Sequence, residues 1–147
     1  MPKPRAPVYE DYKKEFEKFS VDEYTILIWH SCGCAFLVRR LGETKKKIAK
    51  VILVAPWKFP DEWDKIQEKF YTYLIDKSIK TRVKSITIFT ADDEEDEGKE
   101  SAKTFHKALW GEVIELQGKW HYTLWDMKTE EFTELLQLVL KLSLIHI

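Results

Sequence analysis

The stretch that decides the fold is YTILIWHSCGCAFLVRR, residues 24–40. Residues 25–29 form a largely apolar run without alternation, which predicts a buried strand. A sharp turn through residues 30–33 follows, and residues 35–41 then have the apolar spacing of a helix. A strand, a tight turn at a serine and a helix form the arrangement that presents a nucleophilic serine above a sheet edge. The stretch therefore makes Ser31 a candidate nucleophile.

The local pattern departs from the usual Gly-x-Ser-x-Gly of such a turn, because Trp29 occupies the first glycine position. Gly33, the glycine that follows the serine, is present. Taken by itself, Ser31 fits equally a helix N-cap, a common place for serine. The rest of the chain must supply an acid and then a histidine to support a nucleophile.

Length, composition and charge restrict the class of protein. The chain has 147 residues, of which 44% are hydrophobic and 14% aromatic, as expected for one globular domain. Its formal net charge is −1, so there is no basic excess for nucleic acid, and no apolar run approaches membrane-spanning length. We expect a cytoplasmic protein that binds neither nucleic acid nor membrane.

The two cysteines, Cys32 and Cys34, are too close along the chain for an expected disulfide. With no further cysteine, a structural zinc site is not expected either, and both residues are predicted to pack as small apolar side chains. No cofactor or metal is predicted.

Helical and strand patterns alternate along the chain. Helices are predicted at residues 9–19, 35–41, 62–73, 100–110 and from 129 onward, and strands at residues 25–29, 49–55, 85–90 and 112–116. Gly42 is expected to end the second helix, Asp61 to cap the third, and Phe132, Leu135, Leu136 and Val139 to be buried by the last. The order predicts an α/β fold of three α/β/α layers, with helices on both faces of a parallel sheet of about four strands.

Three chemically active features follow strand ends in this arrangement. They are Ser31, the acidic run at residues 92–97 and His121. Because parallel strands end at one edge of the sheet, where α/β proteins bind ligands, we expect these side chains to converge. The alternatives are a solvated acidic loop and a surface histidine; a calcium site lacks the spacing of an EF-hand. His106 and His146 are assigned no role.

Four segments together carry a resemblance to a known family. They are His30-Ser31-x-Gly33-Cys34-Ala35, Val-Ile-Leu-Val-Ala-Pro-Trp at residues 51–57, Ile-Thr-Ile-Phe at residues 86–89 followed by Asp92-Asp93, and Gly118-x-x-His121. With them, about residues 4–140 of the chain resemble the small α/β-hydrolases of the serine-hydrolase family that includes retinoblastoma-binding protein nine.

The resemblance implies a catalytic triad in the chain order serine, acid, histidine. Ser31 would be the nucleophile and His121 the general base and acid. Asp93 is the favoured acid, with Asp92 close behind it, and the backbone N–H of Cys32 would donate to the oxyanion. Trp57 and Trp63 line an acyl pocket or simply pack in the core, and the sequence favours neither.

The chain departs from the family in several places. Trp29 replaces a small residue beside the serine, and Glu94 stands where the family often has proline. Family members carry an additional strand, a His-Gly loop with a second oxyanion donor, a helix and a strand upstream. We therefore expect a domain over residues 1–141 that is incomplete at its N-terminus, with an exposed sheet edge open to self-association. Residues 142–147 are expected to be a non-native tail.

Two function classes follow. The first is a serine hydrolase, carboxylesterase-like, that cleaves a small ester, thioester or amide through a Ser-Asp-His triad. The alternative is a catalytically weak or inactive hydrolase-like fragment or binding module, which the missing donor loop and Trp29 favour.

Overall fold

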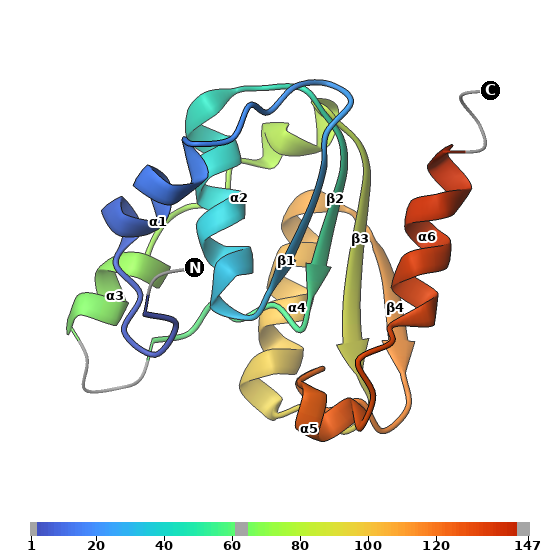
Figure 1. Cartoon of the computed structure of the whole chain (residues 1–147). Helices are drawn as coiled ribbons and strands as arrows, with labels where there is room; N and C mark the ends of the chain where they lie inside the picture. Colours follow the sequence, from blue (N-terminus) through green and yellow to red (C-terminus); the bar gives the residue numbers. More distant parts are fainter. Residues whose placement is uncertain (1–2, 61–64, 144–147) are drawn as a thin grey trace.

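The computed structural model describes residues 3–60 and 65–143 of the chain, and a four-stranded parallel sheet lies at its centre (Figure 1). The strands lie in the order β1-β2-β3-β4, the order in which they occur along the chain: β1 (Ile26–His30), β2 (Ile48–Val54), β3 (Val83–Ala91) and β4 (Glu112–Leu116). The prediction of an α/β fold with a parallel sheet of about four strands is confirmed.

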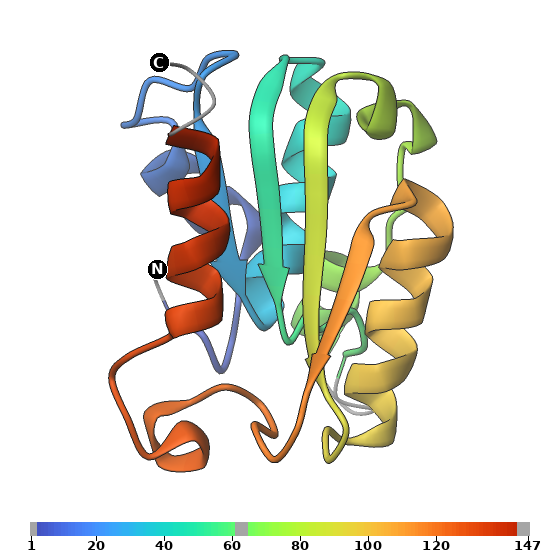
Figure 2. The ribbon, with the colours of Figure 1, turned by 90° about the vertical axis from the view of Figure 1, so that its right-hand side faces the viewer.

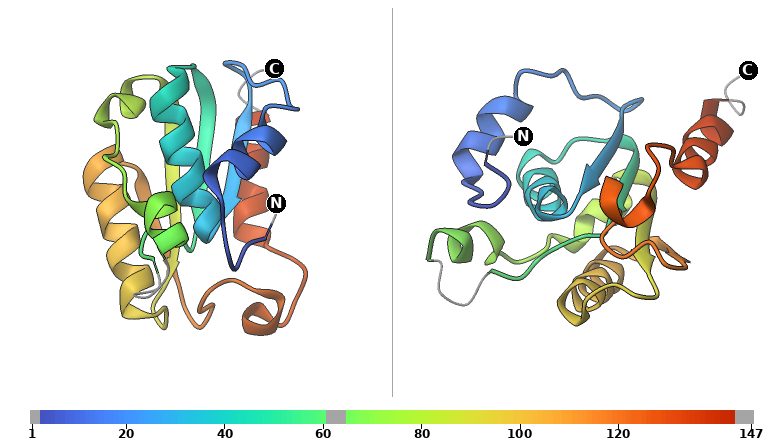
Figure 3. Two further views of the ribbon diagram at one scale, coloured as in Figure 1. Left: turned by 90° about the vertical axis from the view of Figure 1, so that its left-hand side faces the viewer. Right: turned by 60° about the horizontal axis from the view of Figure 1, so that its bottom comes forward.

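Helices cover both faces of the sheet. They are α1 (Tyr9–Phe16), α2 (Cys32–Thr44), α3 (Lys65–Tyr71), the 3-10 helix η1 (Lys77–Thr81), α4 (Asp96–Leu109), α5 (Leu124–Met127) and α6 (Thr133–Ser143). Figure 2 shows α6 on one face of the sheet, with α2 and α4 on the opposite face; Figure 3 places α1 and α3 on that opposite side as well. The α/β/α layering matches the alternation seen in the sequence.

Alternate residues of the central strands point into two separate cores, as the twofold period of a strand requires. Val51 and Leu53 of β2 and Ile88 of β3 pack with α2 and α4 in the larger core. Ile52 and Phe89, from the same strands, point to the other side, where half-buried side chains of α6 cover them. The absence of alternation in β2 is therefore explained by apolar cover on both faces.

Some boundaries differ from the predicted ones. Gly42 does not end α2, which continues to Thr44 and closes at Lys45 in the left-handed conformation. A Cβ at Gly42 would lie 3.2 Å from the Cβ of Asp76, so this glycine permits close packing instead of stopping a helix.

Helix α6 begins at Thr133 instead of near residue 129, and Leu136 is 57% exposed, so its predicted burial is wrong. The helical spacing places Phe132, Leu135 and Val139 against the second core. Three of the predictions concern residues outside the described ranges. They are the helix cap Asp61, the pocket residue Trp63, and residues 144–147 of the tail.

Strand β1 lies at an edge of the sheet. It pairs with β2, and within the described ranges no strand lies along its other side. Ile28, in the middle of β1, is 44% exposed. Self-association through this edge stays a prediction.

The tight turn after β1 is compatible with Trp29 because residue 33 has no side chain. The Trp29 indole packs against Phe16 and Phe36, with ring centroids 5.9 and 5.3 Å away. A Cβ on Gly33 would lie 2.7 Å from Cε3 of Trp29, closer than any real contact. The bulky residue before the turn and the glycine after it therefore form one packing unit.

We expect Gly33→Ala to lower the free energy of unfolding by about 1–3 kcal/mol, because the methyl group overlaps the indole. The same substitution in a Trp29→Leu background should cost less, since the smaller side chain leaves room. Urea unfolding of the wild type, both single variants and the double variant measures this coupling. Equal costs in the two backgrounds would show that the overlap does not matter.

Candidate active site

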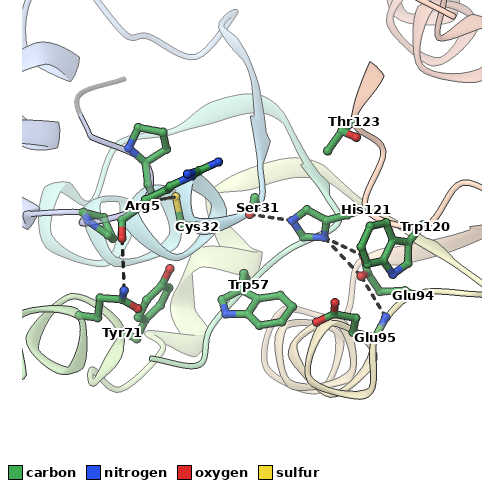
Figure 4. Close-up of a pocket in the computed structure, with 13 residues that line it drawn as sticks. Arg5, Ser31, Cys32, Trp57, Tyr71, Glu94, Glu95, Trp120, His121 and Thr123 are labelled. Atoms are coloured by element: carbon green, nitrogen blue, oxygen red, sulfur yellow. Dashed lines mark hydrogen bonds and ion pairs between the residues drawn. The ribbon is translucent and has the colours of Figure 1, made fainter. Parts of the chain in front are cut away.

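The predicted reactive side chains meet at the edge where the parallel strands end (Figure 4). Ser31 follows β1, Glu94 follows β3, and His121 follows β4. Trp57, which follows β2, packs edge-on against the imidazole of His121 with ring centroids 5.8 Å apart. All four strands thus contribute to one site through the loops at their carboxyl ends.

Ser31 occupies a backbone conformation that few residues other than glycine adopt, with φ 54° and ψ −130°. Hydrogen bonds to neighbouring segments hold it there. Its N–H donates to the carbonyl of Val54 at 3.0 Å, and its carbonyl accepts from the N–H groups of Cys34 and Trp57 at 3.0 and 3.2 Å. A strained conformation fixed in this way presents the hydroxyl above the sheet edge and directs the first N–H groups of α2 toward the same space.

His121 joins the serine to a carboxylate. Its Nε2 lies 2.8 Å from the Ser31 Oγ, and its Nδ1 lies 3.1 and 3.3 Å from the two carboxylate oxygens of Glu94. Because a carboxylate only accepts, Nδ1 carries the proton and Nε2 is left to accept the serine hydroxyl. This tautomer is the one that a general base beside a serine needs.

The prediction that Asp93 contacts His121 is wrong, because Glu94 occupies that position. The Asp93 carboxylate accepts the N–H of Trp120 at 2.8 Å, and Asp92 accepts the N–H of Gly118, also at 2.8 Å. Both aspartates therefore hold the loop that carries His121 by its backbone. The structure brings together Ser31 and His121 from the predicted set and substitutes Glu94 for the predicted acid.

Glu94 is buried and its surroundings suit a carboxylate. Its side chain is 1% exposed, and one of its oxygens accepts the N–H of Glu95 at 3.1 Å. The carboxylate lies just before the N-terminus of α4, where the helix dipole favours negative charge. A Cβ on Gly98 would lie 2.6 Å from the Glu94 Cγ, so the glycine makes room for this side chain. In the sequence, the feature that could have indicated Glu94 as the acid is Gly98, four residues after it.

The loop around His121 has left-handed backbone on both sides of the histidine, with φ 38° at Trp120 and 56° at Tyr122. The Tyr122 hydroxyl donates to the Thr90 carbonyl at 2.5 Å, which anchors the loop to the end of β3. Burial raises the pKa of Tyr122 above its usual range, so this hydroxyl remains a donor at ordinary pH.

A cavity of about 440 Å³ opens beside the serine. Ser31, Cys32 and His121 line it together with the aromatic side chains of Trp57, Tyr71 and Trp120 and the charged side chains of Arg5, Glu94 and Glu95. The volume lies within the range of small-molecule sites. Trp57, one of the two predicted pocket tryptophans, thus borders the space next to the candidate nucleophile.

Within residues 3–60 and 65–143, no group of three or more His, Cys, Asp or Glu side chains is placed to hold a metal ion. Among the helices that the structure describes, none is long and apolar enough to cross a membrane.

Cys34 is fully buried, and burial raises the pKa of its thiol well above the usual value.

A comparison with protein families gives a match to the family described as serine hydrolase, over residues 4–133. The chain belongs to the serine hydrolase family. A comparison with curated protein sequences gives no match.

Two solved structures have a fold similar to that of this chain. The ydeN gene product of B. subtilis superposes with a TM-score of 0.84 at 18% identity, covering 96% of this chain and 78% of that one. A structure from work on carboxylesterases of the thaumarchaeon Nitrososphaera gargenis gives a TM-score of 0.67 at 13% identity, covering 100% of this chain and 76% of that one. At these identities the two structures show that this chain shares their fold.

We expect Gly98→Ala to displace the Glu94 carboxylate and to break its contact with His121, because the new methyl group would overlap Glu94. The downfield imidazole N–H proton of His121 in NMR spectra should then disappear or exchange faster with water. Gly42→Ala, at a helical glycine remote from the site, is the matched control. An unchanged His121 resonance in folded Gly98→Ala protein would contradict the expected overlap.

Proposed function

We propose that this protein hydrolyses a small ester, thioester or amide through Ser31, His121 and Glu94. The observation that carries the proposal is the continuous hydrogen-bonded chain from the Ser31 hydroxyl through both imidazole nitrogens to the Glu94 carboxylate. This geometry suits acyl transfer by a serine nucleophile.

In the proposed reaction, the Ser31 oxygen attacks the acyl carbonyl while His121 Nε2 takes the hydroxyl proton. Glu94 stabilises the imidazolium that results. The C–O, C–S or C–N bond of the substrate then breaks, and the same proton passes from Nε2 to the leaving group. Water then attacks the acyl-serine ester while His121 Nε2 takes its proton. The bond between the acyl carbon and the Ser31 oxygen breaks, the acid leaves, and the proton passes from Nε2 to the Ser31 oxygen.

Negative charge on the tetrahedral intermediate needs hydrogen-bond donors. The N–H of Cys32 is in a suitable place, since Cys32 is the first residue of α2 and the first turn of a helix has no internal acceptors. Loss of one such donor typically costs about 10²–10³ in turnover, so a site with this donor alone would be slow. The aromatic walls given by Trp57, Tyr71 and Trp120 suit an apolar acyl or leaving group.

The closer grouping with retinoblastoma-binding protein nine, the cytoplasmic location and a small acyl compound as the partner belong to this proposal. The motifs at residues 30–35, 51–57, 86–93 and 118–121 support the closer grouping, and the size of the cavity supports a small acyl compound. The cytoplasmic location is kept as the expectation from the sequence.

Labelling with a fluorophosphonate probe tests the proposed nucleophile. We expect one adduct on Ser31 in the wild type, no adduct in Ser31→Ala, and labelling at least about 10²-fold slower in His121→Ala, because the general base is absent. Mass spectrometry of the intact protein and its peptides measures this. A folded, monodisperse wild type that takes up no probe would instead support the alternative of an inactive binding module.

A second experiment distinguishes the two candidate acids. Glu94→Gln should lower kcat/KM for p-nitrophenyl acetate by about 10²-fold or more, because an amide does not stabilise the imidazolium and can favour the wrong tautomer. Asp93→Asn, the matched control, keeps an oxygen that can accept the Trp120 N–H, so its effect should be much smaller. A larger loss in Asp93→Asn than in Glu94→Gln would return the acid role to Asp93.

A further inference from the structure

A second histidine lies directly against the first. His30, the last residue of β1, has its ring centroid 5.1 Å from that of His121. Its Nε2 lies 2.7 Å from the backbone carbonyl oxygen of His121, although the two residues are 91 positions apart. The proposed reaction uses neither nitrogen of His30, so this contact has another purpose.

The direction of this hydrogen bond is fixed by chemistry. A backbone carbonyl only accepts, so Nε2 of His30 carries a proton and donates it. Desolvation of the ring is the main cause that lowers the pKa of His30 below its usual value. The hydrogen bond to the His121 carbonyl acts in the opposite direction and raises this pKa. The imidazole of His121 lowers it, and the carboxylates of Glu94 and Asp126 raise it. The lowered pKa favours the neutral form of His30, which still donates through Nε2.

The loop that carries His121 needs an anchor on the serine side of the sheet. It leaves β4, at one end of the strand order, whereas Ser31 follows β1 at the other end. Asp92, Asp93 and Thr90 hold this loop to the end of β3 through the N–H groups of Gly118 and Trp120 and the hydroxyl of Tyr122. The bond from His30 runs to β1, one residue before the nucleophile.

We propose that His30 is a positioning residue that fixes the distance between Ser31 and His121. It ties the backbone of His121 to β1, the strand directly before Ser31, so the side chains of Ser31 and His121 move together. This role rests on the proposed hydrolase function for its kinetic consequence, but the contact itself can be tested without turnover.

Two substitutions differ only in reach. The amide nitrogen of Gln is as many bonds from Cα as Nε2 of histidine, whereas that of Asn is one bond shorter. His30→Gln should therefore keep the donor, and His30→Asn should lose it, with a polar side chain in both. His106→Asn is the control for the same substitution elsewhere in the chain, because the ring of His106, in α4, also contacts a backbone carbonyl, with its Nδ1 2.8 Å from that of Gly111.

With p-nitrophenyl acetate, we expect His30→Asn to lower kcat about 10-fold or more with KM nearly unchanged, since small misplacements of a catalytic group cost up to about 10²-fold. His30→Gln should remain within about 3-fold of wild type, as should His106→Asn. Equal kcat values for His30→Asn and His30→Gln would overturn the proposal.

NMR spectroscopy keeps the test independent of catalysis. The Nδ1–H proton of His121 should remain sharp in His30→Gln and in His106→Asn, and should broaden or exchange at least about 10-fold faster in His30→Asn. Should the wild type neither label nor hydrolyse, the proposed function fails, while this spectrum still decides the role of His30. An unchanged His121 resonance in His30→Asn would overturn the positioning role.

Discussion

The site depends on one imidazole that is held at both of its nitrogens. His121 accepts from Ser31 on one side and donates to Glu94 on the other, which sets its tautomer and its orientation together. Neither contact is local in sequence, since the three residues follow β1, β3 and β4. The parallel register of the sheet is what makes them neighbours, because it places the end of each strand at the same edge.

Holding these groups requires strained backbone at the serine and on both sides of the histidine. Conformations with positive φ at Ser31, Trp120 and Tyr122 each cost of order 1–3 kcal/mol. Hydrogen bonds from adjacent strand ends offset this cost: Val54 and Trp57 bind the serine backbone, and Asp93 binds the N–H of Trp120. The strain is thus located where a fixed geometry matters, and the sheet beneath it supplies the rigidity.

The sequence predicts the sheet and its layers well, because β2 is a long, mostly apolar run and β3 is rich in β-branched residues, and both lie between helical patterns. It predicts β4 at the residues where the structure has it, 112–116. The short elements η1 and α5 were missed, since five and four residues give no measurable periodicity. The predicted end of α2 at Gly42 is wrong for a different reason. The sequence does not distinguish a glycine that ends a helix from one that makes room for a neighbouring segment, here the turn at Asp76.

That Ser31 and His121 would meet could be predicted, because each follows a strand end and parallel strands end at the same edge of the sheet. The acid could not be found in this way. Six consecutive acidic residues, 92–97, follow β3. Asp92 and Asp93 accept backbone N–H groups of the histidine loop, whereas the side chain of Glu94 faces the histidine. Which one does so depends on the rotation of the loop, a property that spacing does not reveal.

Side-chain length explains why Asp92, Asp93 and Glu94 make different contacts. Asp92 and Asp93 have short side chains, which suits the backbone amides of Gly118 and Trp120 immediately beside them. Glu94 has one more methylene group and reaches the imidazole from a position one residue nearer to α4, where Gly98 leaves space for it. The aspartates therefore place the loop, and the glutamate meets the side chain that the loop carries. An acid can shift by one position along such a loop when the longer side chain compensates for the longer distance and a glycine in the following helix turn admits it.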